Sequence, residues 1–291
     1  MARARTTSPA VGEFVQGLEQ RLDATLHELD RLVVNPRPAA SALHRLHRDL
    51  RRLRTGVGIW ARLLPKTPRA EVEGYDRRLK RLARLVGGVR DRDVTLGLLA
   101  DRTLPGSAQE RIRLHQVRAR LVDDARVGRE LLRVFLRSER DAGLFEGVRT
   151  SLHLKPRGNR VQHLEGYLAE IRDESRREVQ AAHRRARRKP STRRLHRLRI
   201  RMRNWRHLAD LSLTLVPTQP PLPAPPPLRA LQRRLGRLHD LEVAENLARP
   251  ARGTRWARSL EEEQRRQRRR IVQQLKTHRS REVVPPPESV V

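Results

Sequence analysis

Two arginine-rich segments lying 152 residues apart share one helical pattern. "LHRLHRDLRRLRTGVGI" covers residues 43–59, and "LHRLRIRMRNWRHLADL" covers residues 195–211. In both, apolar residues recur at steps of three, four and three, which places them on one face of an α-helix. The pattern predicts two core helices in which an apolar face and a basic face lie side by side.

The two copies match in both their apolar and their basic positions. The apolar seam consists of Leu43, Leu46, Leu50 and Leu53 in the first copy and of Leu195, Leu198, Met202 and Trp205 in the second. Beside it run His44, His47, Arg51 and Arg54, matched by His196, Arg199, Arg203 and Arg206, and Arg48 and Arg52 join the first set. We interpret these basic residues as two related anion-binding faces.

A second pair of segments repeats at an offset of 149 residues, aligning 79–94 with 228–243. The aligned functional candidates are Lys80 with Arg229, Arg84 with Arg233, Gly87 with Gly236, and Asp91 with Asp240. A glycine inside a helix costs about 1 kcal/mol relative to alanine, so we expect each to allow close packing of another helix. The aspartates are expected to orient the arginines; ordinary surface ion pairs are the alternative.

The two offsets predict an internal duplication and an all-α fold of two helical bundles related by a pseudo-twofold axis. We expect one domain over residues 12–282, with halves at about 12–154 and 158–282 and flexible tails at 1–11 and 283–291. The predicted helices span residues 12–34, 41–64, 69–87, 89–102, 107–139, 142–153, 159–189, 191–215, 227–249 and 254–282.

Proline and glycine mark the expected helix breaks. Breaks are predicted at "NPRP" (from 35), "PKTP" (65), "LPGS" (104), "LKPRGN" (154) and "KPST" (189). The segment 216–227, "VPTQPPLPAPPP", is interpreted as an extended spacer, with proline-rich recognition by another domain as the alternative.

The charge of the chain points to a polyanionic partner. Lys and Arg total 65 against 33 Asp and Glu, giving a formal charge of +32, and all but five of the basic residues are arginine. Such a field attracts nucleic acid, anionic membranes and phosphate polymers. The absence of cysteine excludes thiolate catalysis and disulfides and fits a cytosolic setting. No stretch of about 18 apolar residues is present, so no membrane association is expected.

The two His/Arg helices resemble those of the CHAD family, the conserved histidine α-helical domain. The family helix has the form H-x-x-R-x-x-x-R-R-x-R, followed by a helix ending near L-G-x-x-R-D. Matching residues are His44, His47, Arg51, Arg52 and Arg54 in one half, and His196, Arg199, Arg203, Asn204 and Arg206 in the other. The resemblance covers about residues 12–282, with two departures: His47 replaces an arginine, and Asn204 replaces the second arginine of the pair.

This resemblance implies a particular fold and ligand. The family has two helical bundles around a basic central groove or pore, binds inorganic polyphosphate, and associates with polyphosphate granules. We therefore expect a cytoplasmic protein located at such granules. Because His47 stands where the pattern has arginine, the first half is expected to bind less tightly at neutral pH or to titrate.

The chemistry of the residues agrees with a phosphate ligand. Arginine donates paired hydrogen bonds to phosphate and stays charged, and arginines one helix turn apart can contact successive phosphates. The main alternative is non-specific binding of nucleic acid. Aromatic residues make up only 3% of the chain, and Trp60, Phe135 and Phe145 fall at core positions rather than on a base-stacking surface.

Enzymatic function is not expected, and the pattern implies no cofactor or metal. His44 and His47 have a ligand-compatible spacing, but no acidic residue shares their face. His239–Asp240 resembles the pair of metal phosphohydrolases, yet the aligned residues are Arg90–Asp91. The segment 255–281 has a sparse apolar line of Trp256, Leu260, Ile271 and Leu275, and is interpreted as a solvated closing helix, with a peripheral polyanion contact as the alternative.

Overall fold

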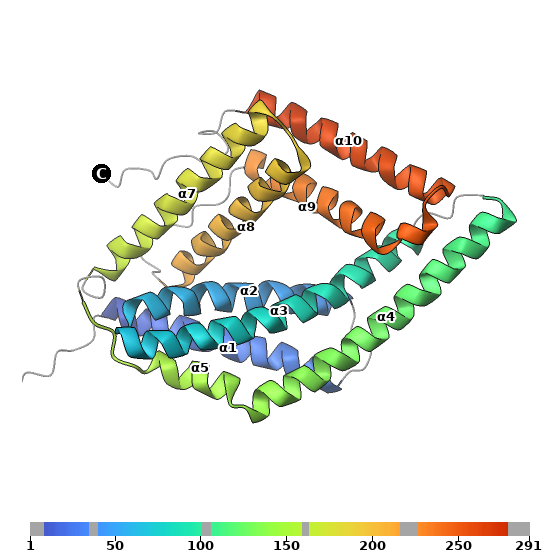
Figure 1. The fold of residues 1–291 in the computed structure, drawn as a ribbon. Helices are drawn as coiled ribbons and strands as arrows, with labels where there is room; N and C mark the ends of the chain where they lie inside the picture. Colours follow the sequence, from blue (N-terminus) through green and yellow to red (C-terminus); the bar gives the residue numbers. More distant parts are fainter. Residues whose placement is uncertain (1–8, 35–39, 101–105, 159–162, 216–225, 279–291) are drawn as a thin grey trace, which may run out of the picture. The chain divides into compact units, whose positions relative to one another are not determined.

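The protein is all-α, as the periodicity predicted. The structure is a computed structural model that describes residues 9–34, 40–100, 106–158, 163–215 and 226–278. These residues form α-helices joined by short turns, together with one 3-10 turn at Arg249–Ala251 (Figure 1). None of the helices in these ranges is long and apolar enough to cross a membrane.

The helix boundaries agree with the expected breaks at most positions. The helices are α1 (Pro9–Val34), α2 (Ala40–Leu63), α3 (Lys66–Ala100), α4 (Ala108–Asp141), α5 (Leu144–Leu152), α7 (Leu164–Arg188), α8 (Thr192–Leu215), α9 (Pro226–Leu247) and α10 (Arg255–Thr277). The predicted breaks near Pro65 and Pro190 are confirmed, because α2 and α3 flank the first proline and α7 and α8 the second.

Two boundary predictions were wrong. Residues 69–87 and 89–102 were expected as separate helices, but α3 runs without interruption from Lys66 to Ala100. Val86 and Val89 are both buried on either side of the glycine pair, so packing keeps the segment helical despite its low propensity. In addition, α1 begins at Pro9, within the predicted tail.

Several predictions lie outside the described residues. These are the breaks at 35 and 104, the greater part of the proline-rich segment, the first eight residues and the C-terminal tail.

The chain forms two compact units, each built from non-contiguous segments. Unit 1 comprises residues 1–90, 127–171 and 207–221, and unit 2 comprises residues 91–126, 172–206 and 222–291. Each unit takes segments from both sequence halves, so the units do not coincide with the halves. The duplication stays a prediction from the sequence.

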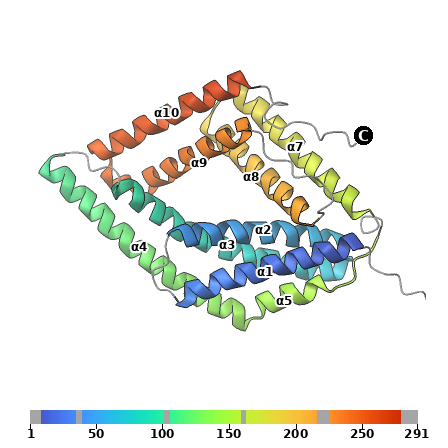
Figure 2. The same cartoon turned by 180° about the vertical axis from the view of Figure 1, so that it is seen from behind.

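One hydrophobic core holds unit 1 together. α1 packs against α2 and α5 (Figure 2), and the core also takes side chains from α3, α4 and α7 and from the C-terminal end of α8. Trp60 anchors it: the side chain is 1% exposed, stacks on Phe14 with ring centroids 6.2 Å apart, and donates its indole N–H to the Ser151 carbonyl oxygen at 2.8 Å. The expectation that Trp60 and Phe145 are core residues is confirmed.

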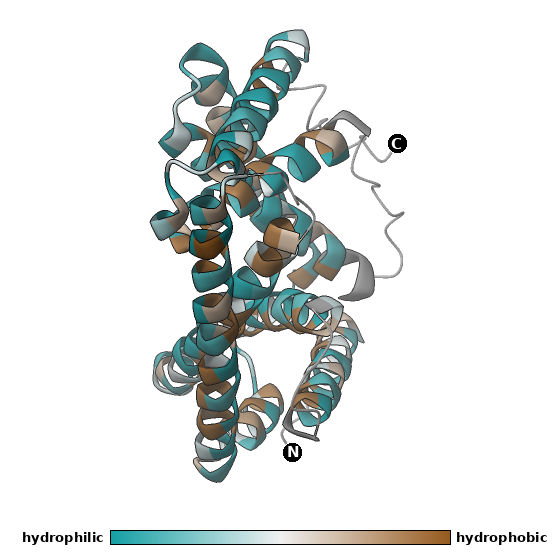
Figure 3. Ribbon diagram, turned by 90° about the vertical axis from the view of Figure 1, so that its right-hand side faces the viewer, coloured by the Kyte–Doolittle hydropathy of each residue, from teal (hydrophilic) through white to brown (hydrophobic). Residues whose placement is uncertain are grey.

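Unit 2 has two smaller cores, and α9 packs against α10. The sparse apolar line of α10 is buried, and Gln264 and Gln267 fill the gap in its middle. Gln264 donates to the Leu241 carbonyl oxygen at 3.2 Å and to the Glu245 carboxylate at 2.9 Å. In Figure 3, which colours the ribbon by hydropathy, hydrophobic and hydrophilic residues alternate along the helices, as expected when they lie on neighbouring faces.

The buried His183 of α7 is expected to make unit 2 sensitive to acid. Burial, followed by Arg187, His278 and Arg184, lowers its pKa from 6.5 to about 4. Because the folded-state pKa lies below the unfolded value, this histidine contributes stability above pH 6.5 that is lost as the pH falls from 6.5 to 4. The loss is at most about 3 kcal/mol.

Urea unfolding of the wild type and of His183→Leu between pH 7.5 and pH 4.5 checks this. The variant should lose less stability than the wild type across this range. Equal losses in the two proteins would show that other groups control the acid response.

Candidate functional site

The apolar seams of α2 and α8 are buried as predicted. Leu43, Leu46, Leu50, Leu53, Leu198 and Met202 are fully buried, Leu195 is 2% exposed and Trp205 is 6% exposed. The flanking His and Arg side chains are exposed or half-buried. Each helix therefore buries one stripe and keeps its basic line at the boundary with solvent, which is the geometry that an anion-binding face requires.

In unit 1, α2 and α3 run antiparallel along the first basic face, which we define as the basic candidates of α2 together with Lys80 and Arg84 of α3. Three contacts set the register. Arg90 donates to the His44 imidazole at 3.1 Å, the His47 ring lies against Gly87, and Arg54 contacts Asp76. Lys80 and Arg84 are exposed on the stripe of α3 between Asp76 and Gly87. The structure thus brings together the candidates from both helices.

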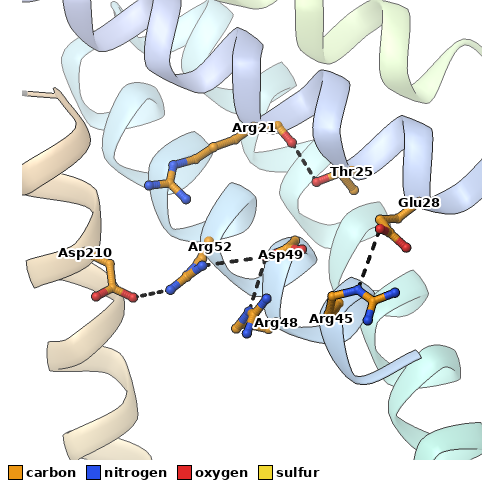
Figure 4. Close-up of polar contacts among 8 residues, drawn as sticks. All are labelled: Arg21, Thr25, Glu28, Arg45, Arg48, Asp49, Arg52 and Asp210. Atoms are coloured by element: carbon orange, nitrogen blue, oxygen red, sulfur yellow. Dashed lines mark hydrogen bonds and ion pairs between the residues drawn. The ribbon is translucent and has the colours of Figure 1, made fainter. Parts of the chain in front are cut away.

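Carboxylates neutralise part of the first basic face. Both oxygen atoms of the Asp76 carboxylate accept hydrogen bonds from the Arg54 guanidinium, at 2.9 and 3.1 Å. Arg52 contacts Asp210 of α8 at 2.5 Å and Asp49 at 3.7 Å, and Arg48 lies 3.5 Å from Asp49 (Figure 4). Three of the five arginines predicted for this face are therefore held by acidic side chains.

Arg21 of α1 lies beside the first face, and His47 within the face accepts a hydrogen bond from Arg51. Burial and the adjacent Arg52 lower the pKa of Arg21 on α1, whose guanidinium extends toward Arg52 in Figure 4. Arg51 donates from Nε to the His47 Nε2 atom at 2.9 Å. This hydrogen bond joins the histidine to a neighbouring arginine on the same helix.

In unit 2, α8 and α9 form the second basic face, which we define as His196, Arg199, Arg203 and Arg206 of α8 with Arg229 and Arg233 of α9. The helices are again antiparallel, because the His196 and His239 rings lie 5.7 Å apart and Gln232 donates to the Met202 carbonyl oxygen at 3.2 Å. This register puts Arg229 level with Arg206. Arg229 and Arg233 are exposed.

The second face has a different electrostatic character. Burial, followed by Arg199 and Arg203, lowers the pKa of His196. Burial also raises the pKa of Glu242, against the opposing effect of Arg268, which donates to its carboxylate at 2.8 Å. Thr192, His196, Arg199, His239 and Glu242 line one small recess with three leucines. The imidazole of His196 is thus biased toward its neutral form.

The two glycines differ in their surroundings. A Cβ atom on Gly87 would lie 3.3 Å from the His47 ring, which agrees with the close approach of a second helix. The same expectation for Gly236 was wrong: among the described residues, nothing lies within 4 Å of the position that a Cβ atom would take there. The aligned residue of His47 is Arg199, which does not use this space.

The orienting role of Asp91 and Asp240 stays a prediction. Asp91 is the first residue of unit 2, whereas the arginines that it was expected to orient belong to unit 1. The carboxylates that do hold arginines of the first face are Asp76, Asp210 and Asp49.

Sequence comparison between the halves had no means of finding these acids. Asp76 aligns with Pro225 and Asp49 aligns with Arg201, so neither forms part of a repeated pattern. In unit 2, Arg201 contacts Glu178 of α7 at 2.7 Å instead. The acidic partners are specific to each unit.

In the described ranges, no group of three or more His, Asp or Glu residues is placed so that it could hold a metal ion. His44 accepts a hydrogen bond from Arg90, and the His239 ring lies beside the His196 ring.

The comparisons with known proteins agree with this arrangement. The CHAD domain family model matches residues 16–249. The chain belongs to the CHAD domain family. The solved structure of the CHAD domain from the plant Ricinus communis is similar with a TM-score of 0.69 and 17% sequence identity, covering 93% of this chain and 92% of that chain. This likeness shows the CHAD fold. No curated protein matches the chain significantly.

The ion pair between Arg54 and Asp76 predicts a difference between two aligned arginines of this CHAD protein. Arg54→Ala leaves the Asp76 carboxylate, whose side chain is only 28% exposed, without its bidentate partner. We expect a loss of about 1–2 kcal/mol in the free energy of unfolding.

The matched variant Arg206→Ala should lose less than about 0.5 kcal/mol, because no ion pair is observed for Arg206 among the described residues. Urea denaturation of both variants checks this. Equal destabilisation would contradict a structural role specific to Arg54.

Proposed function

We propose that the protein binds inorganic polyphosphate without catalysis, through the first and second basic faces. The family membership supports this ligand, since the CHAD resemblance implies polyphosphate binding. The proposal places the protein at polyphosphate granules in the cytoplasm. It requires no cofactor.

The repeated helix pair carries the proposal. In each unit, an antiparallel pair of helices buries an apolar seam and presents basic residues from both helices along one edge. Successive basic residues on a helix are three or four positions apart, which corresponds to about 5 Å along the axis. A linear phosphate chain lying along such an edge can accept hydrogen bonds from one guanidinium after another. The groove or pore implied by the family stays a prediction.

The types of side chain on the two faces support the proposal of binding without turnover. The faces offer guanidinium and imidazole groups, which stabilise phosphate charge, but phosphoryl transfer also needs an activated nucleophile and usually a metal ion. The His239–Asp240 pair resembles that of metal phosphohydrolases, and the His239 ring lies beside the His196 ring of the second face. We therefore assign the faces to recognition.

Non-specific nucleic-acid binding is the alternative, and the burial of aromatic rings weighs against it. Trp60, Trp205, Trp256 and Phe145 are all at most 6% exposed. Proteins that bind single strands stack bases on exposed aromatic side chains. A duplex would be held by phosphate contacts alone, so a competition titration at fixed salt separates the two ligands: polyphosphate should displace DNA at equal phosphate concentration.

Neutralising the second face should weaken polyphosphate binding strongly. The variant replaces four arginines by glutamine: Arg203, Arg206, Arg229 and Arg233. At about 1 kcal/mol per lost phosphate contact, affinity should fall on the order of 100-fold or more, and its salt dependence should become shallower. Fluorescence anisotropy with labelled polyphosphate measures both.

A variant of α10 supplies the control for net charge. Replacing Arg265, Arg266, Arg269 and Arg270 by glutamine removes the same charge from exposed positions on a solvated helix. This protein should bind within a few-fold of the wild type. If both variants lose affinity equally, binding reflects overall charge and the assignment to the second face fails.

The lowered pKa of His196 predicts tighter binding at lower pH. A polyanion beside the imidazole raises its pKa, so the bound state takes up a proton that the free state lacks. Affinity should therefore increase as the pH falls below 6.5 toward 5, and less so in His196→Gln. The measurement is a series of binding titrations at constant ionic strength. An identical pH dependence in the two proteins would exclude His196 as the responsible group.

A further inference from the structure

A basic recess lies at the turn that joins α7 to α8 in unit 2. Its volume is about 450 Å³, and the residues that line it are Lys189, Ser191, Arg193, Arg194 and Arg197. Four of these side chains carry a positive charge and the fifth carries a hydroxyl group. None of the five belongs to the first or the second basic face. The recess is therefore a separate concentration of positive charge.

The recess lies on a different side of α8 from the second basic face. Arg193 and Arg197 are four positions apart, so they share one side of the helix. Arg197 and Arg199 are two positions apart, which places them about 200° apart around the helix axis. An anion in the recess is thus held by other side chains than an anion on the second basic face.

The cations of the recess have no acidic partner in the part of the chain that the structure describes. Residues 179–209 contain no Asp or Glu, and eight of the fourteen residues from 184 to 197 are Arg or Lys. By contrast, Arg201 on the same helix is paired with Glu178 at 2.7 Å. Like charges that are held close together repel each other, so an anion bound between them also relieves this repulsion.

The turn holds one of these cations in place. Arg194 donates from Nη1 to the Arg185 carbonyl oxygen at 3.2 Å and to the Lys189 carbonyl oxygen at 3.5 Å. The Ser191 carbonyl oxygen accepts hydrogen bonds from the backbone N–H groups of Arg194 and Leu195, at 3.0 and 2.9 Å. Because these contacts fix the turn before a ligand arrives, little ordering is needed on binding.

The start of the helix does not require these arginines. At the offset of 152 residues, Arg193 and Arg194 align with Ser41 and Ala42. These two residues follow Ala40, the first residue of α2. The corresponding helix of the first half therefore begins without an arginine at either position. The cations are specific to the second half, which favours a role in binding over a role in folding.

The size and the chemistry of the recess select the ligand. Its volume corresponds to about fifteen water molecules of ~30 Å³ each, which leaves room for several linked phosphate groups. Guanidinium groups donate paired hydrogen bonds to phosphate, and the lining has no aromatic ring on which a base could stack. An oligophosphate carries one charge on each phosphate and a second, with a pKa near 6, at each end. The roughly four to five negative charges of tripolyphosphate match the four cations.

We propose that this recess binds a short oligophosphate, or the end of a longer polyphosphate chain, as a site separate from the two basic faces. A turn gathers cations around one point, whereas the two faces extend along helices. The recess therefore suits the doubly charged end of a phosphate chain better than its interior. Binding of a free oligophosphate is independent of the proposed function, whereas binding of a chain end rests on it.

Lys189 is a natural reporter of occupancy in the wild-type protein. Of the other lysines, Lys80 belongs to the first basic face, and three exposed ones serve as controls: Lys66, Lys155 and Lys276. A bound polyanion covers the Lys189 amine and stabilises its charged, unreactive form. Amine acetylation followed by mass spectrometry of the peptides therefore measures binding at this site.

About 1 mM tripolyphosphate should slow the acetylation of Lys189 at least about fivefold, and that of the three control lysines less than about twofold. The ionic strength is held constant throughout. A Lys189 that stays unprotected, or that is equally protected by sulfate, would overturn the proposal.

Two matched variants test the lining of the recess. Arg193→Gln with Arg197→Gln removes two cations from the recess, and Arg184→Gln with Arg188→Gln removes two exposed cations at the same spacing from α7. The first variant should raise the tripolyphosphate concentration for half-protection of Lys189 at least about tenfold, and the second less than about threefold. Equal effects would show that the local charge attracts the anion without a defined site, which contradicts the proposal.

Long-chain polyphosphate separates the two sources of the ligand when it is compared with tripolyphosphate at an equal concentration of chain ends. Equal protection of Lys189 shows that the ends of long chains also bind, and protection by tripolyphosphate alone restricts the ligand to free oligophosphates. Stronger protection per chain end would mean that the chain interior binds, against the proposal. Tripolyphosphate should still protect Lys189 in the variant that neutralises the second face, so failure of either proposal can be distinguished from failure of the other.

Discussion

The structure depends on burying a narrow apolar seam directly beside a line of guanidinium groups. The chain carries a formal charge of +32, and hydrophobic residues make up 37% of it. Because the positive charges repel each other, each core helix must bury apolar residues and also carry arginines at its surface. The α-helix permits this because positions one residue apart point about 100° away from each other. Leu43 is fully buried while the adjacent His44 is exposed, and Leu195 and His196 repeat this relation. Long arginine side chains can reach the solvent from positions next to the core.

The two basic faces hold arginine and histidine side chains close together by different interactions. In unit 1, Asp76, Asp49 and Asp210 hold arginines in place, and Arg51 donates a hydrogen bond to His47. Neutralisation of this kind fixes the direction of a guanidinium but reduces its attraction for a ligand. In unit 2, Arg229 and Arg233 are exposed, and His196 is held below its usual pKa by burial and arginines. The expectation that the first half binds less tightly at neutral pH or titrates at His47 stays a prediction.

The sequence by itself determined the helical class, the two buried seams, the adjoining basic lines and the resemblance to the CHAD family. These features follow from periodicity along one helix, which is a local property of the chain. Only the tertiary structure decided which carboxylates hold the arginines, since Arg52 and Asp210 are 158 positions apart and Arg54 and Asp76 are 22 apart. It also decided that α3 continues through its glycine pair. Gly87 lies against the His47 ring, whereas none of the described residues lies within 4 Å of a Cβ atom placed on Gly236. Each of these outcomes depends on which helix packs against which, and a repeat pattern within a single helix carries no record of its neighbours.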